Sequence, residues 1–163
     1  MTNQPTFVTA LYRLLDRLEI VFLGAAVISL LLQYAGYQPA SSGLMISLTS
    51  LAVVYFLNGY KPPSSEQTGE KKDFTALLSQ TILPKVLWIS CAVGTIGILF
   101  HLLNLPGAQQ MLMIAAASNA FGVVLFLILS AISSTETQKL AATMYRVVPL
   151  LLICGYLLLR TAE

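Results

Sequence analysis

The residue types that most often do chemistry in proteins are few in this chain, and they are scattered. His101 is the only histidine, and a single imidazole does not build a His-rich metal site. Cys91 and Cys154 both lie inside apolar stretches, where we expect small packing residues rather than a disulfide. No Gly-rich phosphate loop is present, and no serine has a base at a recognisable spacing. The sequence therefore predicts no catalytic residue, no cofactor and no metal site, and the protein is not expected to be an enzyme.

The Asp, Glu, Lys and Arg residues lie outside the long apolar stretches. Two long uncharged gaps separate Glu19 from Lys61 and Lys85 from Glu136, and a third, shorter gap separates Arg146 from Arg160. Proton relays and ion-coupled carriers usually need an ionisable group deep inside a membrane span. Glu19 comes nearest, at the edge of the first gap, and a local ion pair with Arg17 is the preferred interpretation over a coupling site.

The composition predicts the class of protein. Of the 163 residues, 56% are hydrophobic and 10% are charged, and the mean hydropathy is +0.78. Soluble domains carry about 25% charged residues. A bilayer core takes roughly 20 helical residues, so the first two gaps each hold two spans and the third holds one. Residues 123–129 lack the alternation of a transmembrane β-strand. We expect an all-α integral membrane helical bundle of about five transmembrane helices.

Polar and turn-forming residues divide the chain into four parts. Residues 1–60 hold an amphipathic helix and the first transmembrane hairpin, 61–73 a polar cytoplasmic linker, 74–133 a second amphipathic helix and hairpin, and 134–163 the final transmembrane helix. The amphipathic stretches either lie in the membrane interface or extend the spans that follow them.

The same plan occurs twice, which predicts a tandem hairpin repeat. Residues 9–11 read Thr-Ala-Leu, as do residues 75–77, and residues 44–46 read Leu-Met-Ile, as do residues 112–114. The offset between matched positions stays between 66 and 70. Because each unit contributes two spans, both copies have the same orientation in the membrane.

The basic residues predict the orientation. Eight of them fall on one side under five spans, and only Arg160 falls on the other; the eight are Arg13, Arg17, Lys61, Lys71, Lys72, Lys85, Lys139 and Arg146. The positive-inside rule then makes the N-terminus cytoplasmic and the C-terminus periplasmic in a cell inner membrane. The net charge of +2, with basic residues at helix ends, argues against nucleic acid as a partner.

Small and polar residues mark the expected contacts between helices. We expect helix packing or partner contact at Gly94, Gly97, Ser118, Asn119 and Gly122. An amide in hydrocarbon needs hydrogen-bond partners, so Asn119 is expected to face protein rather than lipid. Near the outer interface, His101 and Asn104 are spaced to form a polar pair, either as an anchor or as a gate or partner contact.

Residues 99–119, Leu-Phe-His-Leu-Leu-Asn-Leu-Pro-Gly-Ala-Gln-Gln-Met-Leu-Met-Ile-Ala-Ala-Ala-Ser-Asn, carry a family resemblance. Mainly over residues 85–130, the chain resembles the transmembrane hairpin of GldL, the inner-membrane motor subunit of Bacteroidota gliding motility and type 9 secretion. The resemblance implies a bacterial inner-membrane protein. His101, Asn104 and Leu105 stand where that family has lysine, histidine and tryptophan, and Asn119 stands where it has an intramembrane glutamate. An amide does not carry a proton, so the resemblance implies the hairpin without the motor function.

These patterns favour a non-catalytic inner-membrane subunit or scaffold. Its expected partners are the lipid bilayer and either other membrane protein subunits or further copies in a homo-oligomer. The alternative is a small multi-pass transporter or channel for a small solute or ion. The two differ in whether the polar residues of the spans line a wet cavity or a dry contact between helices.

Overall fold

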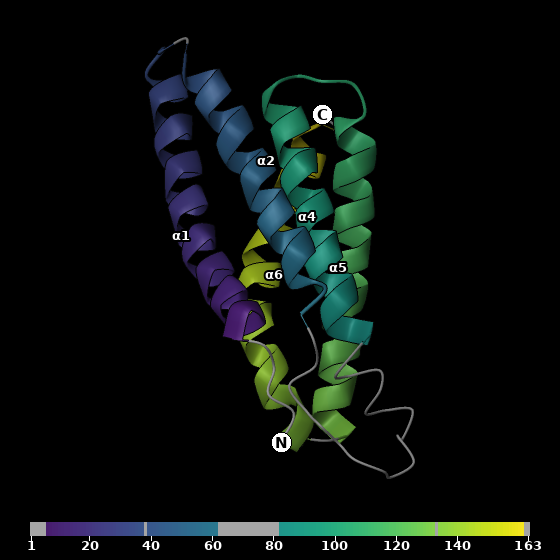
Figure 1. The fold of residues 1–163 in the computed structure, drawn as a ribbon. Helices are drawn as coiled ribbons and strands as arrows, with labels where there is room; N and C mark the ends of the chain where they lie inside the picture. The colour runs from purple at the N-terminus through teal and green to yellow at the C-terminus, as the bar shows by residue number, and fades with distance from the viewer. Residues whose placement is uncertain (1–5, 38, 62–81, 133, 162–163) are drawn as a thin grey trace.

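The computed structural model describes residues 6–37, 39–61, 82–132 and 134–161, and all regular structure within them is helical. The helices are α1 (Thr6–Tyr34), α2 (Ala40–Asn58), α4 (Leu83–Leu102), α5 (Ala108–Ile132) and α6 (Ser134–Thr161). Their axes lie alongside one another, and the two helices of each hairpin run in opposite directions (Figure 1). The two short turns and the end of α6 lie at one end of the bundle, and α1 begins toward the other.

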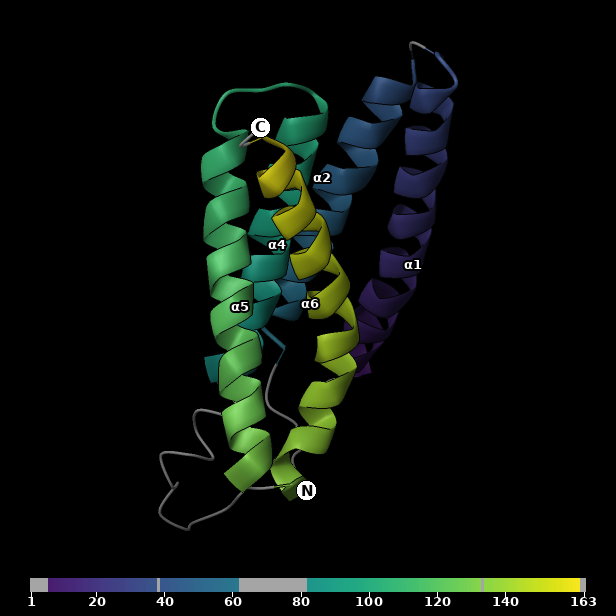
Figure 2. The same ribbon diagram turned by 180° about the vertical axis from the view of Figure 1, so that it is seen from behind.

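Two hairpins and a final helix make up the bundle. α1 packs on α2, α4 packs on α5, and α2 joins the hairpins through its contact with α4. α6 covers α4 and α5 from behind, as the reversed view shows (Figure 2). α1 packs chiefly on α2, and in both views it lies at the edge of the bundle.

Among the residues that the structure describes, four helices are long and apolar enough to cross a membrane. They are Ala40–Asn58, Leu83–Leu102, Ala108–Ala131 within α5, and Thr143–Arg160 within α6. The predicted all-α, multi-pass architecture is therefore confirmed. The expected fifth span, α1, is not among the four, and its first half carries Arg13, Asp16, Arg17 and Glu19.

The structure decides between the two alternatives for the first amphipathic stretch. α1 is continuous from Thr6 to Tyr34, so this stretch extends the helix that follows it. Most of the second stretch, 74–84, and all of the predicted linker 61–73 except Lys61 lie outside the described residues. α4 begins with Pro84 in its first turn, where a proline ring costs no helical hydrogen bond.

The two hairpins turn at matching positions. α1 ends at Tyr34 and α4 at Leu102, while α2 begins at Ala40 and α5 at Ala108, so both boundaries are shifted by the same offset of 68 (102 − 34 and 108 − 40). After each first helix, a residue with left-handed backbone reverses the chain. These residues, Gly36 (φ 84°) and Asn104 (φ 53°), are separated by the same offset.

The hydrogen bonds that end α1 and α4 match as well. In the first turn, the N–H groups of Ala35, Gly36 and Tyr37 donate to the carbonyls of Leu31, Gln33 and Leu32. In the second, those of Leu103, Asn104 and Leu105 donate to Leu99, His101 and Phe100. Each donor and each acceptor is shifted by that same offset. Such paired bonds are a usual way to satisfy the last carbonyls of a helix.

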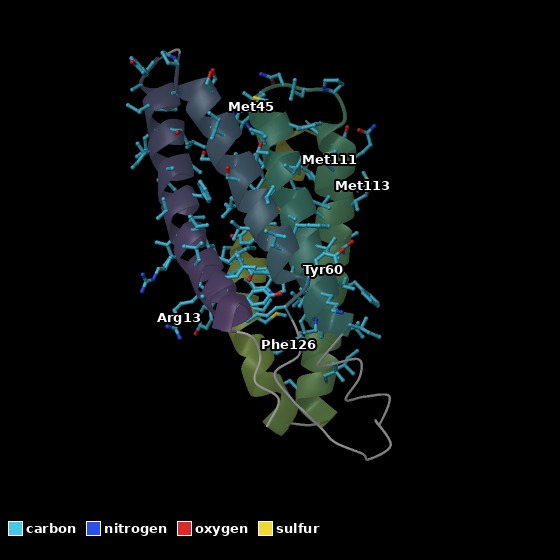
Figure 3. All side chains as sticks on the ribbon, viewed as in Figure 1. Arg13, Met45, Tyr60, Met111, Met113 and Phe126 are labelled. Carbon is cyan, nitrogen blue, oxygen red and sulfur yellow. The ribbon has the colours of Figure 1, made fainter. Side chains whose placement is uncertain are left out.

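The side chains that follow the turns have matching environments. Leu44 and Leu112 are both 0% exposed, whereas Met45 and Met113 are 55% and 56% exposed. Figure 3 shows these two methionines near the hairpin end, on α2 and α5 respectively. The corresponding helices of the two hairpins thus present equivalent faces inward.

Candidate functional site

A part-buried ion pair joins α1 and α6. The carboxylate of Glu19, on α1, is 9% exposed, and its Oε1 accepts a hydrogen bond from Nε of Arg146, on α6. The local pair expected between Glu19 and Arg17 is wrong, because Arg146 is the partner and Arg17 is exposed. Residues two apart on a helix do not face each other, which explains the difference.

Two aromatic side chains from the central helices surround this pair. The guanidinium carbon of Arg146 lies 5.4 Å from the centre of the Trp88 ring, within cation–π range. The Trp88 ring lies 5.7 Å from that of Tyr55, tilted by 46°. Tyr55 is 5% exposed and lies within electrostatic range of both charges. We call Glu19, Tyr55, Trp88 and Arg146 the charge cluster; α1, α2, α4 and α6 each contribute one residue.

The charge cluster lies near the ends of α2 and α4 that are remote from the hairpin turns, and about midway along the longer helices α1 and α6. Glu19 precedes the end of α1 at Tyr34 by about four helical turns, and Tyr55 follows the start of α2 at Ala40 by about the same length of helix. At about 5.4 Å per turn, both lie about 22 Å from the hairpin turn. A hydrocarbon core of about 30 Å would leave the cluster about 8 Å inside its other boundary.

The cluster can fasten helices together, because a buried ion pair is hard to break from one side. Removing one partner leaves an uncompensated charge in a low-dielectric interior. Oε2 of Glu19 is buried and has no hydrogen-bond partner within the described part of the chain. The pair thus holds α1, which otherwise packs chiefly on α2, against α6.

A second contact closes the same end of the first hairpin. The hydroxyl of Tyr12 donates to the carbonyl oxygen of Tyr60 at 3.2 Å, and Nζ of Lys61 lies 5.4 Å from the centre of the Tyr12 ring. Arg13 points away from the bundle (Figure 3). The first half of α1 is therefore amphipathic, with Tyr12 toward the end of α2 and Arg13 outward.

The predicted glycines lie in the contacts among α4, α5 and α6. A Cβ atom on Gly94 would lie 2.5 Å from Cδ2 of Leu150, and one on Gly97 would lie 3.1 Å from the backbone nitrogen of Leu112. A Cβ atom on Gly122 would collide with the side chain of Leu87. Each glycine thus makes room for a leucine of a neighbouring helix, as small residues do in membrane bundles.

The hydroxyl groups of this region are turned to backbone carbonyls. Oγ1 of Thr95 donates to the carbonyl of Cys91 at 2.8 Å, and Oγ of Ser90 donates across the interface to that of Ala115 at 3.3 Å. On α2, Oγ of Ser47 donates to the carbonyl of Leu44 at 3.2 Å. These protons are therefore not available to a passing solute.

Asn119 and Ser118 are neighbours with different environments. Asn119 is 0% exposed, and neither its Oδ1 nor its Nδ2 has a hydrogen-bond partner among the described residues. It follows the start of α5 at Ala108 by about three helical turns, which places it about 16 Å from the hairpin turn and so near the middle of a bilayer. Ser118 is half-buried.

His101 and Asn104 meet through the backbone. His101 is half-buried in the last turn of α4, whereas Asn104 lies beyond the end of that helix and is exposed. The backbone N–H of Asn104 donates to the carbonyl of His101 at 3.2 Å. The two residues thus do not lie one turn apart on a helix face, because α4 ends at Leu102.

Sequence reasoning missed three of the four residues in the charge cluster. A usable signal was present for Arg146, which enters the last apolar stretch from the same end as Glu19 enters the first. Two opposite charges at equal depth in different spans are expected to pair. Tyr55 and Trp88 carried no such signal, since aromatic residues are frequent in apolar spans.

Within the described ranges, no three His, Cys, Asp or Glu side chains gather as metal ligands would. Comparison of the chain with family models, with curated proteins and with solved structures finds no match.

Proposed function

We propose that this chain is a non-catalytic, multi-pass subunit or scaffold of a bacterial inner membrane. It packs against other membrane proteins or against further copies of itself. The observation that most supports this role is the close-packed contact among α4, α5 and α6, where Leu150 and Leu87 fill the space beside Gly94 and Gly122.

Polar residues that could line a path differ in their burial. Thr49 is exposed and Ser50 is half-buried on α2, while Thr95 and Asn119 are fully buried. A conducting path needs polar groups that remain available to an ion or solute along its length. This distribution supports a structural role for the polar residues.

The proposal makes α1 a fifth span with a cytoplasmic N-terminus. After Glu19 the helix is uncharged to its end at Tyr34, and apolar side chains such as Ile20 and Leu31 are 73% and 63% exposed. Such exposure is favourable against lipid. Arg13, Arg17, Lys61, Lys85 and Arg146 lie toward the end of the bundle opposite the turns, which supports a cytoplasmic position for that end.

The resemblance to the GldL hairpin fits this role only as shared ancestry. Asn119 lies in mid-span, where that family has its glutamate, and an amide neither binds nor releases a proton at neutral pH. We therefore propose a related hairpin used for packing rather than for ion-driven motion.

A small transporter or channel is the second candidate, and the charge cluster is what favours it. Ionisable residues inside a membrane commonly mark substrate or ion pathways. Oε2 of Glu19, buried without a partner in the described residues, could bind a cation or a proton entering from the cytoplasmic side.

One purification separates the two candidates. The protein is extracted from its native membrane in a mild detergent, its co-purifying proteins are quantified, and the purified chain is placed in liposomes for ion-flux and proton-flux assays. A subunit or scaffold is expected to co-purify at fixed stoichiometry, with itself or with another protein, and to give no flux. A monodisperse single chain that carries flux, with the flux lost in Glu19→Gln, would overturn the proposal and establish the transporter.

A further inference from the structure

Asn119 has a defined opposite residue in the contact between α4 and α5. Gly97 faces Leu112, Gly94 faces Ala115 and Leu87 faces Gly122. Because α4 and α5 are antiparallel, residues at the same level have numbers with a constant sum, which is 209 for each of these pairs. Ser90 and Asn119 have the same sum (90 + 119). They therefore form the layer between the Gly94–Ala115 contact and the Leu87–Gly122 contact, which we call the polar layer.

The side chain of Asn119 needs hydrogen-bond partners that the described residues around it do not supply. Its carbonyl oxygen accepts hydrogen bonds and its NH₂ group donates two, and both are fully buried without partners in the described residues. The hydroxyl proton of Ser90 is already directed to the carbonyl of Ala115, so Ser90 can only accept. Leaving an amide unsatisfied in an apolar interior is unfavourable.

The surrounding packing limits the size of any occupant. The side chain of Leu87 fills the space beside Gly122, and Cδ2 of Leu150 fills the space beside Gly94. These contacts close the polar layer on the sides nearest the two glycines. Only a very small molecule that both donates and accepts hydrogen bonds matches this site, and water is that molecule.

We propose that one water molecule is bound in the polar layer between α4 and α5. It donates to Oδ1 of Asn119, accepts from Nδ2, and directs its second hydrogen to Oγ of Ser90. Three hydrogen bonds are typical of a water buried in a protein. The site is a property of the second hairpin only, because the equivalent positions of the first hairpin are Phe22 and Leu51, which are apolar.

Nuclear magnetic resonance in detergent micelles tests the proposal on the intact chain. Labelling with ¹⁵N-asparagine gives four side-chain NH₂ groups, and Asn119→Leu, which restores the residue type found at Leu51, assigns that of Asn119 by its loss. We expect a dipolar cross-peak in the rotating frame between the Asn119 NH₂ protons and water. Asn104, which is exposed, provides the control for ordinary exchange with bulk solvent.

The outcomes separate bound water from a dry site. In Ser90→Ala the water cross-peak of Asn119 is expected to weaken or be lost, whereas Thr49→Ala, an exposed position on α2, leaves it unchanged. An Asn119 NH₂ group without a water cross-peak in the wild-type chain would overturn the proposal. A signal that shifts in Ser90→Ala while the wild type shows no water contact would establish a direct Ser90–Asn119 bond instead, and would overturn it equally.

Discussion

At the scale of single residues, Glu19 and Arg146 illustrate how neighbouring charges along the chain can mislead. Arg17 is close to Glu19 in sequence, but it points to a different side of α1 and is exposed. Arg146 is far away in sequence, yet it forms the part-buried hydrogen bond to Glu19. Only the arrangement of helices brings it there, so the pair depends on the whole fold.

Removing Arg146 should destabilise the bundle strongly. Arg146→Leu leaves the carboxylate of Glu19 buried without its partner, and because the arginine is partly exposed we expect a loss of about 1–3 kcal/mol of unfolding free energy. The double variant Glu19→Leu/Arg146→Leu is expected to recover most of that loss, because no charge remains unpaired. Unfolding in detergent mixtures measures the free energy of unfolding of the wild type, the single variant and the double variant. Equal stability of wild type and Arg146→Leu, with Arg13→Leu as the exposed control, would contradict a stabilising pair.

The glycines of the α4–α5 contact lead to a second prediction about residues. Gly122→Ala should destabilise the protein by about 1–3 kcal/mol, because the new methyl group overlaps the side chain of Leu87. Gly24→Ala on α1 is the matched control, since nothing lies within 4 Å of the added Cβ. There the gain in helix propensity, about 1 kcal/mol, favours the folded state. Unfolding curves of both variants test the difference in sign, and destabilisation by both would argue against a specific contact at Gly122.

At the scale of elements, the positions of the hairpins could be predicted from sequence. Gly36 and Pro39 mark the first turn and Pro106 and Gly107 the second, and the structure turns the chain at both. These signals are local, since backbone conformation at Gly and Pro is restricted by the residue itself. The continuity of α1 could not be decided in this way, because an amphipathic stretch suits an interface and a helix end equally well.

The candidate site could be predicted only in part, for a related reason. Gly94, Gly97 and Gly122 were recognisable because close approach of membrane helices requires small residues, whatever the partner. Which leucine each glycine meets depends on the register of two helices, which no single residue reveals. The burial of Asn119 was expected from its polarity in an apolar span.

A duplication predicts that the two hairpins tolerate exchange of equivalent layers. Ser90 and Asn119 correspond, at the offset that relates the two hairpins, to Phe22 and Leu51. Asn119→Leu alone should therefore fold, with a change in unfolding free energy of roughly 2 kcal/mol at most, because interhelical hydrogen bonds in membranes reach only that value. Asn119→Asp should be far worse, since it places a carboxylate without a partner in the buried contact between α4 and α5. The yield of folded protein and the free energy of unfolding in detergent are measured for both variants. Equal yields and equal stabilities of Asn119→Leu and Asn119→Asp would contradict this prediction.

At the scale of the whole molecule, the matching turns and the basic residues lead to a prediction about orientation, namely that both hairpin turns lie on the same side of the membrane. Tyr37 and Leu105 are exposed in the two turns, and Lys61 is exposed at the opposite end of α2. The native thiols, Cys91 and Cys154, are buried and give little background labelling.

We expect Tyr37→Cys and Leu105→Cys to react with a membrane-impermeant maleimide added to cells whose outer membrane has been permeabilised. Lys61→Cys should react only after the inner membrane is opened. The basic side chains at the end of the bundle that carries Lys61 are the physical reason, because they are retained in the cytoplasm during insertion. Labelling of Lys61→Cys with the inner membrane intact would reverse the orientation, and opposite labelling of the two turns would exclude a parallel repeat.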